Sequence, residues 1–156
     1  MPVAKPLAPA PFFALALLGL GLLLGLTARA PKARTLEQTV RASRWKKRVL
    51  LIAAPAADQA DFRAQKQLLA SSKAELAARD LLVIEVLYPQ LSAADRQFLT
   101  QKTGIQPPRF AAVLLGKDGG VKMRSAHPIA PAALFRTIDQ MPMRRQEMRR
   151  GAGEPE

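Results

Sequence analysis

The stretch FAAVLLGKDGGVKMR, residues 110–124, holds two apolar runs separated by a glycine-rich turn. Asp-Gly between two such runs predicts a β-hairpin, because the tight turn needs residues that tolerate positive φ. A glycine-flanked lysine is also found in phosphate-binding loops, but those need a longer glycine loop and a Ser or Thr after the lysine. Here Asp118 follows Lys117 and would repel a phosphate. The stretch therefore predicts the turn between the last two strands of a sheet.

Working outward from the hairpin, apolar periodicity predicts two earlier strands and three helices. The helix after the first strand begins at an Asp58/Asp61 capping signal, and Pro142 stops or kinks the last helix because it disfavours helical geometry at Met141. The predicted strands are 49–53, 81–87, 110–115 and 121–123. The predicted helices are 58–79, a short helix from Ser92 through Leu99 that closes near Gly104, and 131–141. The order β-α-β-α-β-β-α is that of an α/β fold with a central mixed sheet, a single thioredoxin-like domain. Pro108, just before the third strand, is the candidate for a cis peptide bond.

The first 30 residues contain an uncharged apolar core, Pro11 to Ala28. Its length fits the hydrophobic region of a signal peptide or a short membrane anchor. Residues 28–30 have the small-x-small form of a signal-peptidase site, although Pro31 disfavours cleavage there. We expect residues 1–30 to export the domain to the periplasm or the cell exterior, or to anchor it in the membrane. The basic flank after the core favours the opposite, cytoplasm-facing topology, which stays open.

The formal net charge of +12 is concentrated ahead of the predicted domain. Residues 29–48 carry eight basic side chains and one acid, Glu37. We interpret residues 31–44 as a basic linker. A polybasic segment binds anionic lipid surfaces, so a membrane is a candidate partner through residues 11–28 and 29–48. Only 5% of the residues are aromatic, too few for the stacking platform of single-strand binders, so nucleic acid is not expected as a partner.

Composition excludes several chemistries. The sequence has no cysteine, which excludes disulfides, thiol nucleophiles and cysteine-ligated zinc. His127 is the single histidine, so a histidine-rich metal site is excluded, and no cofactor motif is present. Nothing like a nucleophile elbow accompanies His127 and Ser125, so a serine triad is not indicated. We therefore predict no catalytic residues, no metal and no cofactor.

Four segments occur in an order that resembles domain-of-unknown-function family 4174, also called the DUDES domain. They are WKKRVLLIAAP (45–55), RDLLVIEV (79–86), the hairpin stretch (110–124) and IDQMPMRRQEM (138–148). The resemblance covers about residues 36–150. It implies a thioredoxin-like or peroxiredoxin-like fold, usually behind an export signal, with no established activity. The motif residues expected to have structural roles are Trp45, Arg48, Pro108, Gly116, Asp118, Gly119, Asp139, Pro142 and Glu147.

A redox or peroxidase role has been suggested for that family from likeness of fold alone. In thiol-active relatives the reactive cysteine lies in the loop after the first strand. Here that loop reads APAADQAD, residues 54–61, and the whole chain lacks cysteine. Thiol oxidoreductase and thiol peroxidase activity are therefore excluded for this sequence.

The arginines of MPMRRQEMRR, residues 141–150, surround Glu147 just past the predicted end of the last helix. In a structural interpretation, Arg144 or Arg145 pairs with Asp139 or Glu147 at the edge of the domain. In a functional interpretation the same arginines bind an anion or a partner, since guanidinium groups match carboxylate and phosphate. Lys117 and Arg124 would join such a site if the hairpin lies near this segment.

The sequence thus predicts a domain over residues 45–143 and an Arg-rich tail over 144–156 whose end is disordered. We expect an exported or membrane-tethered, non-catalytic binding or scaffold module that recognises a protein or an anionic ligand. Two alternatives stay open. One is a thiol-independent enzyme acting on an anionic substrate through Lys117, Arg144 and Arg145, and the other is a membrane-surface protein that uses residues 29–48.

Overall fold

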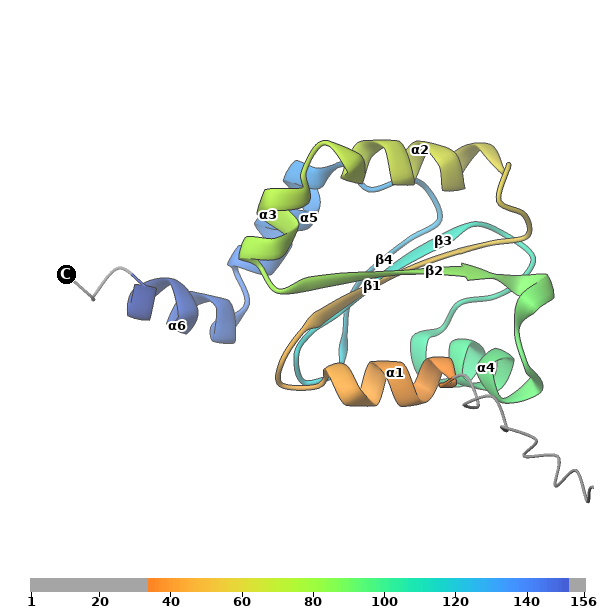
Figure 1. Ribbon diagram of the computed structural model, residues 1–156, viewed down its shortest axis with the longest axis horizontal. Helices are drawn as coiled ribbons and strands as arrows, with labels where there is room; N and C mark the ends of the chain where they lie inside the picture. Colours follow the sequence, from red (N-terminus) through yellow and green to blue (C-terminus); the bar gives the residue numbers. More distant parts are fainter. Residues whose placement is uncertain (1–33, 152–156) are drawn as a thin grey trace, which may run out of the picture. The chain divides into compact units, whose positions relative to one another are not determined.

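The computed structural model describes residues 34–151, which form a four-stranded mixed sheet between two layers of helices (Figure 1). The strand order is β2-β1-β3-β4. β1 pairs with β2 in parallel and with β3 in antiparallel orientation, and β3 pairs with β4 in antiparallel orientation. The strands are β1 (Arg48–Ala54), β2 (Leu81–Leu87), β3 (Ala111–Leu115) and β4 (Val121–Ser125). All four predicted strands are confirmed.

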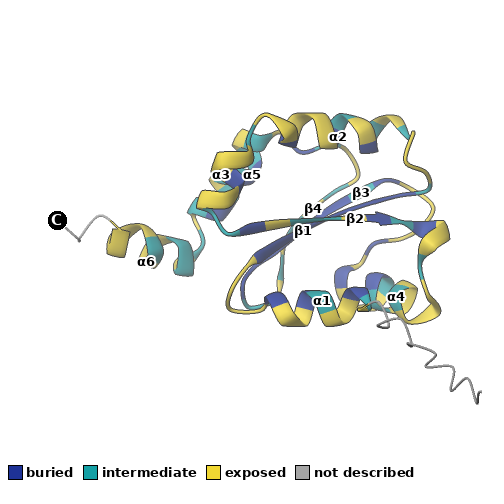
Figure 2. Ribbon diagram, viewed as in Figure 1, coloured by how far each residue is buried: buried dark blue, intermediate teal, exposed yellow. Residues whose placement is uncertain are grey.

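β1 lies in the middle of the sheet and is buried along its whole length. Its side chains alternate between the two faces, so Leu50 and Ile52 belong to one apolar cluster while Leu51 and Ala53 belong to the other. A strand covered on both faces reads as a continuous apolar run. The uninterrupted apolar residues of this segment have that cause, and Figure 2 shows the buried strands between more exposed helices.

One face of the sheet is covered by α2 (Ala60–Ala70), α3 (Lys73–Ala78) and α5 (Pro131–Asp139) (Figure 1). The predicted single helix over 58–79 is in fact two helices, interrupted after Ala70. The side chain of Gln59, rather than that of Asp58, caps the first of them by accepting a hydrogen bond from the backbone of Phe62 at 2.8 Å.

The other face is covered by α1 (Leu36–Ser43), α4 (Ala93–Phe98) and the short η2 (Leu99–Thr103), a π-helix. The prediction that residues 31–44 form a linker is wrong for the part that the structure describes. Thr35 and Gln38 form a capping box, and Leu36 and Val40 are buried against the sheet. The basic composition of this segment concealed the apolar side of a short helix.

The connections agree with the hairpin prediction. Gly116 donates its backbone N–H to the carbonyl of Gly120 at 2.9 Å, and Gly119 has a φ of 82°. The peptide bond between Pro107 and Pro108 is cis, as predicted. The short η1 (Tyr88–Gln90) links β2 to α4.

The chain continues past α5 into α6 (Pro142–Gly151). Pro142 ends the preceding helix as predicted, but it also begins a new one. The prediction that residues 144–156 form a tail is therefore wrong for residues 144–151, which are helical; the remainder lies outside the described residues. α6 has no fully buried residue. Its attachment to the domain must come from polar contacts.

The predicted signal peptide or anchor, residues 1–30, lies outside the described part of the chain. Within residues 34–151, none of the helices is long and apolar enough to cross a bilayer.

The strand order and the helices on both faces of the sheet confirm the predicted α/β fold for the described residues. The mixed four-stranded sheet resembles that of the thioredoxin-like fold.

Candidate functional site

Two of the residues predicted to bind an anion, Lys117 and Arg144, lie in a cluster of ion pairs that joins α6 to the domain. Lys117 Nζ is 2.8 Å from a carboxylate oxygen of Asp80 and 2.8 Å from one of Glu147. Arg144 lies 3.3 Å from Asp139 and 3.6 Å from Glu147. Both cations are therefore already paired with carboxylates of this cluster.

Arg48 forms the buried centre of the same cluster. Its side chain is 1% exposed, and its terminal nitrogens bind Glu147 at 3.1–3.2 Å and the carbonyl of Arg79 at 2.8 Å. Arg79 in turn binds Asp139 at 2.8 Å. A buried charge needs such partners, because an unpaired one is strongly destabilising.

The protonation equilibria of the cluster reflect these pairs. Burial opposes ionisation of Glu147, but hydrogen bonds from Lys117 and Arg48 outweigh it and hold the pKa of Glu147 below its ordinary value. The hydrogen bond from Lys117 is the main cause that lowers the pKa of Asp80. Burial works against the ammonium of Lys117, yet its two carboxylate partners raise its pKa. All three groups are therefore held in their charged forms at neutral pH.

The other two candidates, Arg124 and Arg145, lie outside this cluster. Arg145 is exposed and forms no ion pair with any residue of 34–151. Arg124 extends from β4 and donates its Nε–H to the carbonyl of Thr103 at 2.8 Å. The structure thus brings together Lys117 and Arg144 but places Arg124 beside η2. The predicted four-residue anion patch does not assemble as one site.

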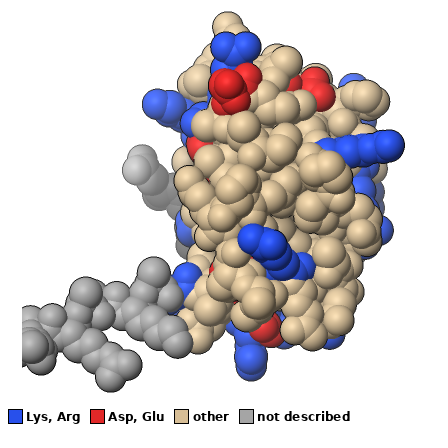
Figure 3. Space-filling model, turned by 90° about the vertical axis from the view of Figure 1, so that its right-hand side faces the viewer, with Lys and Arg blue, Asp and Glu red and all other residues tan. Residues whose placement is uncertain are grey.

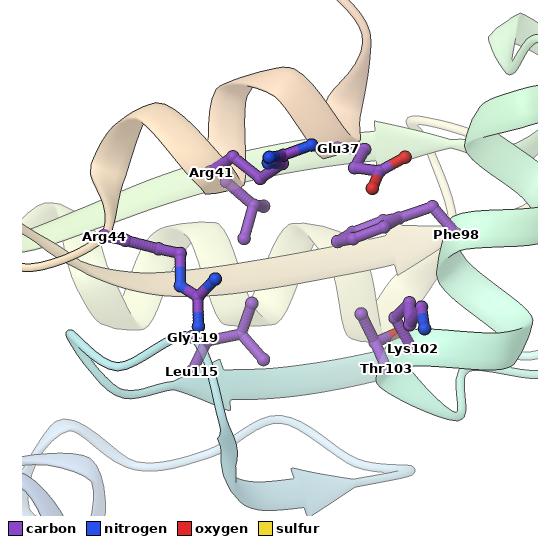
Figure 4. Close-up of a pocket in the computed structure, with 9 residues that line it drawn as sticks. Glu37, Arg41, Arg44, Phe98, Lys102, Thr103, Leu115 and Gly119 are labelled. Carbon is purple, nitrogen blue, oxygen red and sulfur yellow. The ribbon is translucent and has the colours of Figure 1, made fainter.

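A groove of about 400 Å³ lies between α1, η2 and the hairpin, on the face of the sheet that carries α1 (Figure 4). Arg41 and Arg44 reach it from α1 and the turn that follows, and Lys102 reaches it from η2. Phe98 extends from α4 toward α1, and Leu115 lies below it, so the base of the groove is apolar (Figure 4).

The cations of this groove have no carboxylate partner. Arg41, Arg44 and Lys102 form no ion pair with any residue in the described part of the chain, and Glu37 is the acid among the lining residues. Arg44 is held in place by a neutral acceptor, because its Nε and Nη2 atoms bind the carbonyl of Asp118 at 3.1 and 2.8 Å. Positive charge at the mouth of a concave site raises the local concentration of anions. The groove is therefore a better anion site than the cluster around Arg48, whose cations are already paired with carboxylates.

The local conformation of η2 positions Lys102. The π-helix is closed by the hydroxyl of Thr103, which donates to the carbonyl of Leu99 at 2.6 Å, and ends at Gly104 with a φ of 73°. π-Helical turns are rare and frequently mark functional sites. Arg124 binds the carbonyl of Thr103 and so holds the end of η2, but its side chain is not part of the groove lining.

The loop after β1 is where thiol-active relatives carry the reactive cysteine. A cavity of about 360 Å³ lies there, lined by Gln59, Asp61, Pro108 and His127 among others. The hydroxyl of Ser125 donates to the backbone carbonyl of His127 rather than to its imidazole, so these residues do not form the start of a triad. Figure 3 views the end of the molecule where β1 and β2 terminate. Uncharged atoms cover most of its centre and the cations are scattered.

The motif residues of the hairpin form and stabilise its turn. Gly116 and Gly119 form the hairpin turn, where Asp118 accepts a hydrogen bond from the backbone of Gly120 at 3.1 Å and pairs with Lys122. Trp45 differs from these motif residues, because its side chain is 64% exposed. Within residues 34–151, no group of His, Asp and Glu side chains is arranged to hold a metal ion.

Sequence reasoning missed the groove because it assigned Arg41 and Arg44 to a linker. The signal was present: Thr35 and Gln38 form the capping pattern, and Leu36 and Val40 have helical spacing. A helix there would have placed both arginines on the exposed side of a packed element. Lys102 had no comparable signal, because a π-helix has no sequence pattern that separates it from an α-helix.

Comparison with known proteins gives a family match and distant relatives. The family profile described as "Domain of unknown function (DUF4174)" matches residues 39–147. The coiled-coil domain-containing protein 80 of Danio rerio is 29% identical over 141 residues, which covers 75% of this chain and 16% of that protein. The sushi repeat-containing protein SRPX of Rattus norvegicus is 29% identical over 120 residues, covering 66% of this chain and 25% of that protein. The chain thus spans a quarter or less of the length of these relatives.

Among solved structures, the reduced 2-Cys peroxiredoxin of Plasmodium vivax is similar with a TM-score of 0.51 at 14% identity. The similarity covers 69% of this chain and 83% of that one. At this identity the similarity concerns the fold alone. The name of that protein refers to two cysteines, and this chain has no cysteine.

Proposed function

We propose that this chain, which belongs to the DUF4174 family, is a non-catalytic binding module. It holds an anionic ligand in the groove between α1 and η2. One observation carries the proposal. Arg41, Arg44 and Lys102 surround an apolar base and form no ion pair with any residue in 34–151. Cations left without partners around a concave site are available to a ligand, whereas those of the Arg48 cluster are not.

The lack of cysteine in the sequence supports binding rather than thiol catalysis. Thiol chemistry is excluded by the sequence, and the loop after β1 carries Pro55 and Gln59 where a nucleophile would lie in thiol-active relatives. The side chain of Gln59 is itself used to cap α2. The alternative of an enzyme that holds an anionic substrate with Lys117 and Arg144 loses support, because both side chains are already paired with carboxylates.

The membrane-surface alternative also loses support from the packing of α1. An interfacial helix inserts its apolar side into lipid. In α1 that side consists of Leu36 and Val40, which are 8% and 6% exposed because they pack against the sheet. Arg41 of α1 and Arg44 just after it are thus presented to solvent by a folded domain rather than by a free amphipathic segment.

We place this module outside the cytoplasm, exported or anchored by the apolar core of residues 11–28. The support is the sequence of that segment, which lies outside the described residues. N-terminal sequencing of the protein recovered from fractionated cells tests the placement. Recovery of a chain that starts at Met1 in the soluble cytoplasmic fraction would refute it.

Binding of labelled polyanions tests the proposed groove. Fluorescence anisotropy with a labelled oligoglutamate and a labelled sulfated oligosaccharide measures the affinity of the purified chain for two anions of different chemistry. Substituting Arg41 and Lys102 by Ala should weaken binding of at least one of them about tenfold or more, as for loss of two charge-assisted contacts. The matched control removes Arg63 and Lys73, two exposed cations without ion pairs on α2 and α3. Equal affinity for both double variants would refute the proposal.

A further inference from the structure

Trp45 combines three features that its role in the fold does not explain. It is the single tryptophan of the chain, its side chain is 64% exposed, and its φ is +64°. A bulky residue in the left-handed region is strained, and such strain is often found at ligand sites. Its backbone N–H donates to the carbonyl of Lys117 at 2.7 Å, which fixes the conformation. The exposed indole adds little to the core and is available to a partner.

A pocket of about 300 Å³ lies beside this indole. Met141, Pro142 and Met143, between α5 and α6, supply an apolar wall. Arg48 forms part of the lining as well, and its Nε–H, fully buried, has no acceptor among residues 34–151. That nitrogen has almost no accessible surface, so the apolar wall is what the pocket offers to an occupant.

The pocket and the basic groove meet at the hairpin. Arg44 and Gly119 line the groove, whereas their chain neighbours Trp45 and Asp118 line the pocket. The guanidinium of Arg44 binds the carbonyl of Asp118, so it lies where the two cavities adjoin. An extended ligand can therefore occupy both.

We infer that the ligand of the groove is an acidic polypeptide segment, one of whose large apolar side chains enters the pocket between Trp45 and Met143. The inference rests on the proposed anion-binding function and specifies its ligand class. A sugar polyanion or a phosphate would be held by the cations of the groove but has no group for an apolar pocket.

The charges around the pocket support an acidic partner. Asp118, the carboxylate of the lining, is paired with Lys122 at 2.7 Å. Lys46, next to Trp45, and Arg145, two residues after Met143, are exposed and form no ion pair with any residue described. Exposed tryptophan and arginine are the residues enriched at the energetic centres of protein interfaces.

Intrinsic fluorescence tests the inference, because emission comes from Trp45 alone. The full chain is titrated with an octamer of glutamates that carries one central leucine, with the same octamer carrying serine instead, and with a sulfated oligosaccharide of equal charge. The leucine peptide should bind about tenfold more tightly than the serine peptide, the gain expected for burying a leucine side chain. It alone should shift the emission of Trp45 to shorter wavelength as the indole loses water.

Two variants of α6 distinguish the loss of the pocket wall from the loss of a methionine elsewhere on the same helix. Met143→Ala should reduce the preference for leucine to less than about threefold, since a pocket that has lost its wall buries less of the side chain. Met148→Ala, a 40% exposed methionine outside the pocket, should leave the preference unchanged. Equal affinities of the two peptides, or an unshifted emission, would overturn the peptide inference. If the sulfated oligosaccharide binds and both peptides do not, the peptide inference fails while the anion groove stands; if no anion binds, both fail.

Discussion

Arg48, the first residue of β1, and Glu147, in α6 near the end of the described chain, form a two-point ion pair. Nη2 of the arginine lies 3.1 Å from Oε1 and 3.2 Å from Oε2 of the glutamate. The arginine is almost completely buried, whereas the glutamate is 25% exposed. The pair therefore couples an exposed helix to the central strand, and it explains why a helix without a buried residue is part of the domain.

Removing the carboxylate of this pair should destabilise the protein strongly. Glu147→Gln is expected to lower the free energy of unfolding by about 3 kcal/mol, because the buried Arg48 charge loses its partner. Urea denaturation measures the change. The control is Glu85→Gln, which breaks an ion pair with Lys66 that is about half exposed on both sides, and it should cost less than about 0.5 kcal/mol. Similar losses for both variants would contradict a special role for the buried pair.

Acid should weaken the fold through the same cluster. The pKa values of Asp80, Asp139 and Glu147 lie below their ordinary values in the folded protein. The unfolded chain then binds more protons than the folded one at pH values between the two sets of pKa values. Stability should be complete above about pH 5 and fall as the pH drops through 4 and below. Urea midpoints between pH 3 and pH 7 measure how stability depends on pH, and Glu147→Gln should make this dependence shallower. An unchanged dependence would contradict a contribution of Glu147 to the acid sensitivity.

Tyr88 should cause a loss of stability at the alkaline end. Burial raises the pKa of this phenol to about 12, and its hydroxyl donates to the carbonyl of Arg109 at 2.6 Å. Since the unfolded phenol ionises near pH 10, stability should fall by about 2 kcal/mol between pH 10 and pH 12. The chain has a single tyrosine, so absorbance of the tyrosinate reports its titration directly. A folded-state midpoint near 10 would be inconsistent with the buried position, and Tyr88→Phe should remove this part of the alkaline slope.

The strain at Trp45 can be measured by two truncations that remove the same indole. At ordinary backbone angles Ala is more stable than Gly, because Gly loses more entropy on folding. At a φ of +64° the order should reverse, with Trp45→Gly more stable than Trp45→Ala by about 1 kcal/mol. Thermal or urea unfolding of the two variants gives the difference directly. A more stable alanine variant would show that the backbone is relaxed at this position.

Most of the fold could be predicted from the sequence, because its strands are short apolar runs bounded by turns. The second strand, Leu81–Leu87, was predicted to the residue, and the Asp118-Gly119 turn followed from the backbone that a hairpin requires. The wrong predictions concern segments in which the basic composition was given more weight than the helical spacing of the apolar residues. In α6 the arginines outnumber the methionines, and α1 is a short helix inside a segment rich in basic residues, so these helices were assigned to a tail and a linker.

The site could be predicted only in part. The structural interpretation that Arg144 pairs with Asp139 or Glu147 could be made from the sequence, because these residues are close in the chain. Lys117 was expected only as an anion-binding residue, whereas it pairs with Asp80, which is 37 residues away. A pairing between such distant residues has no local pattern. Arg41 and Lys102 approach one groove only because α1 and η2 pack on the same face of the sheet, which requires the tertiary structure.

Nuclear magnetic resonance of the isotope-labelled chain tests the central claim most directly. Backbone amide shifts are followed while the leucine-containing oligoglutamate is added at low ionic strength. The account predicts that shift changes concentrate at residues 37–46, 98–104 and 116–119, around the groove and Trp45. Changes that concentrate instead at the loop after β1, or along α6 at Arg144 and beyond, would contradict it.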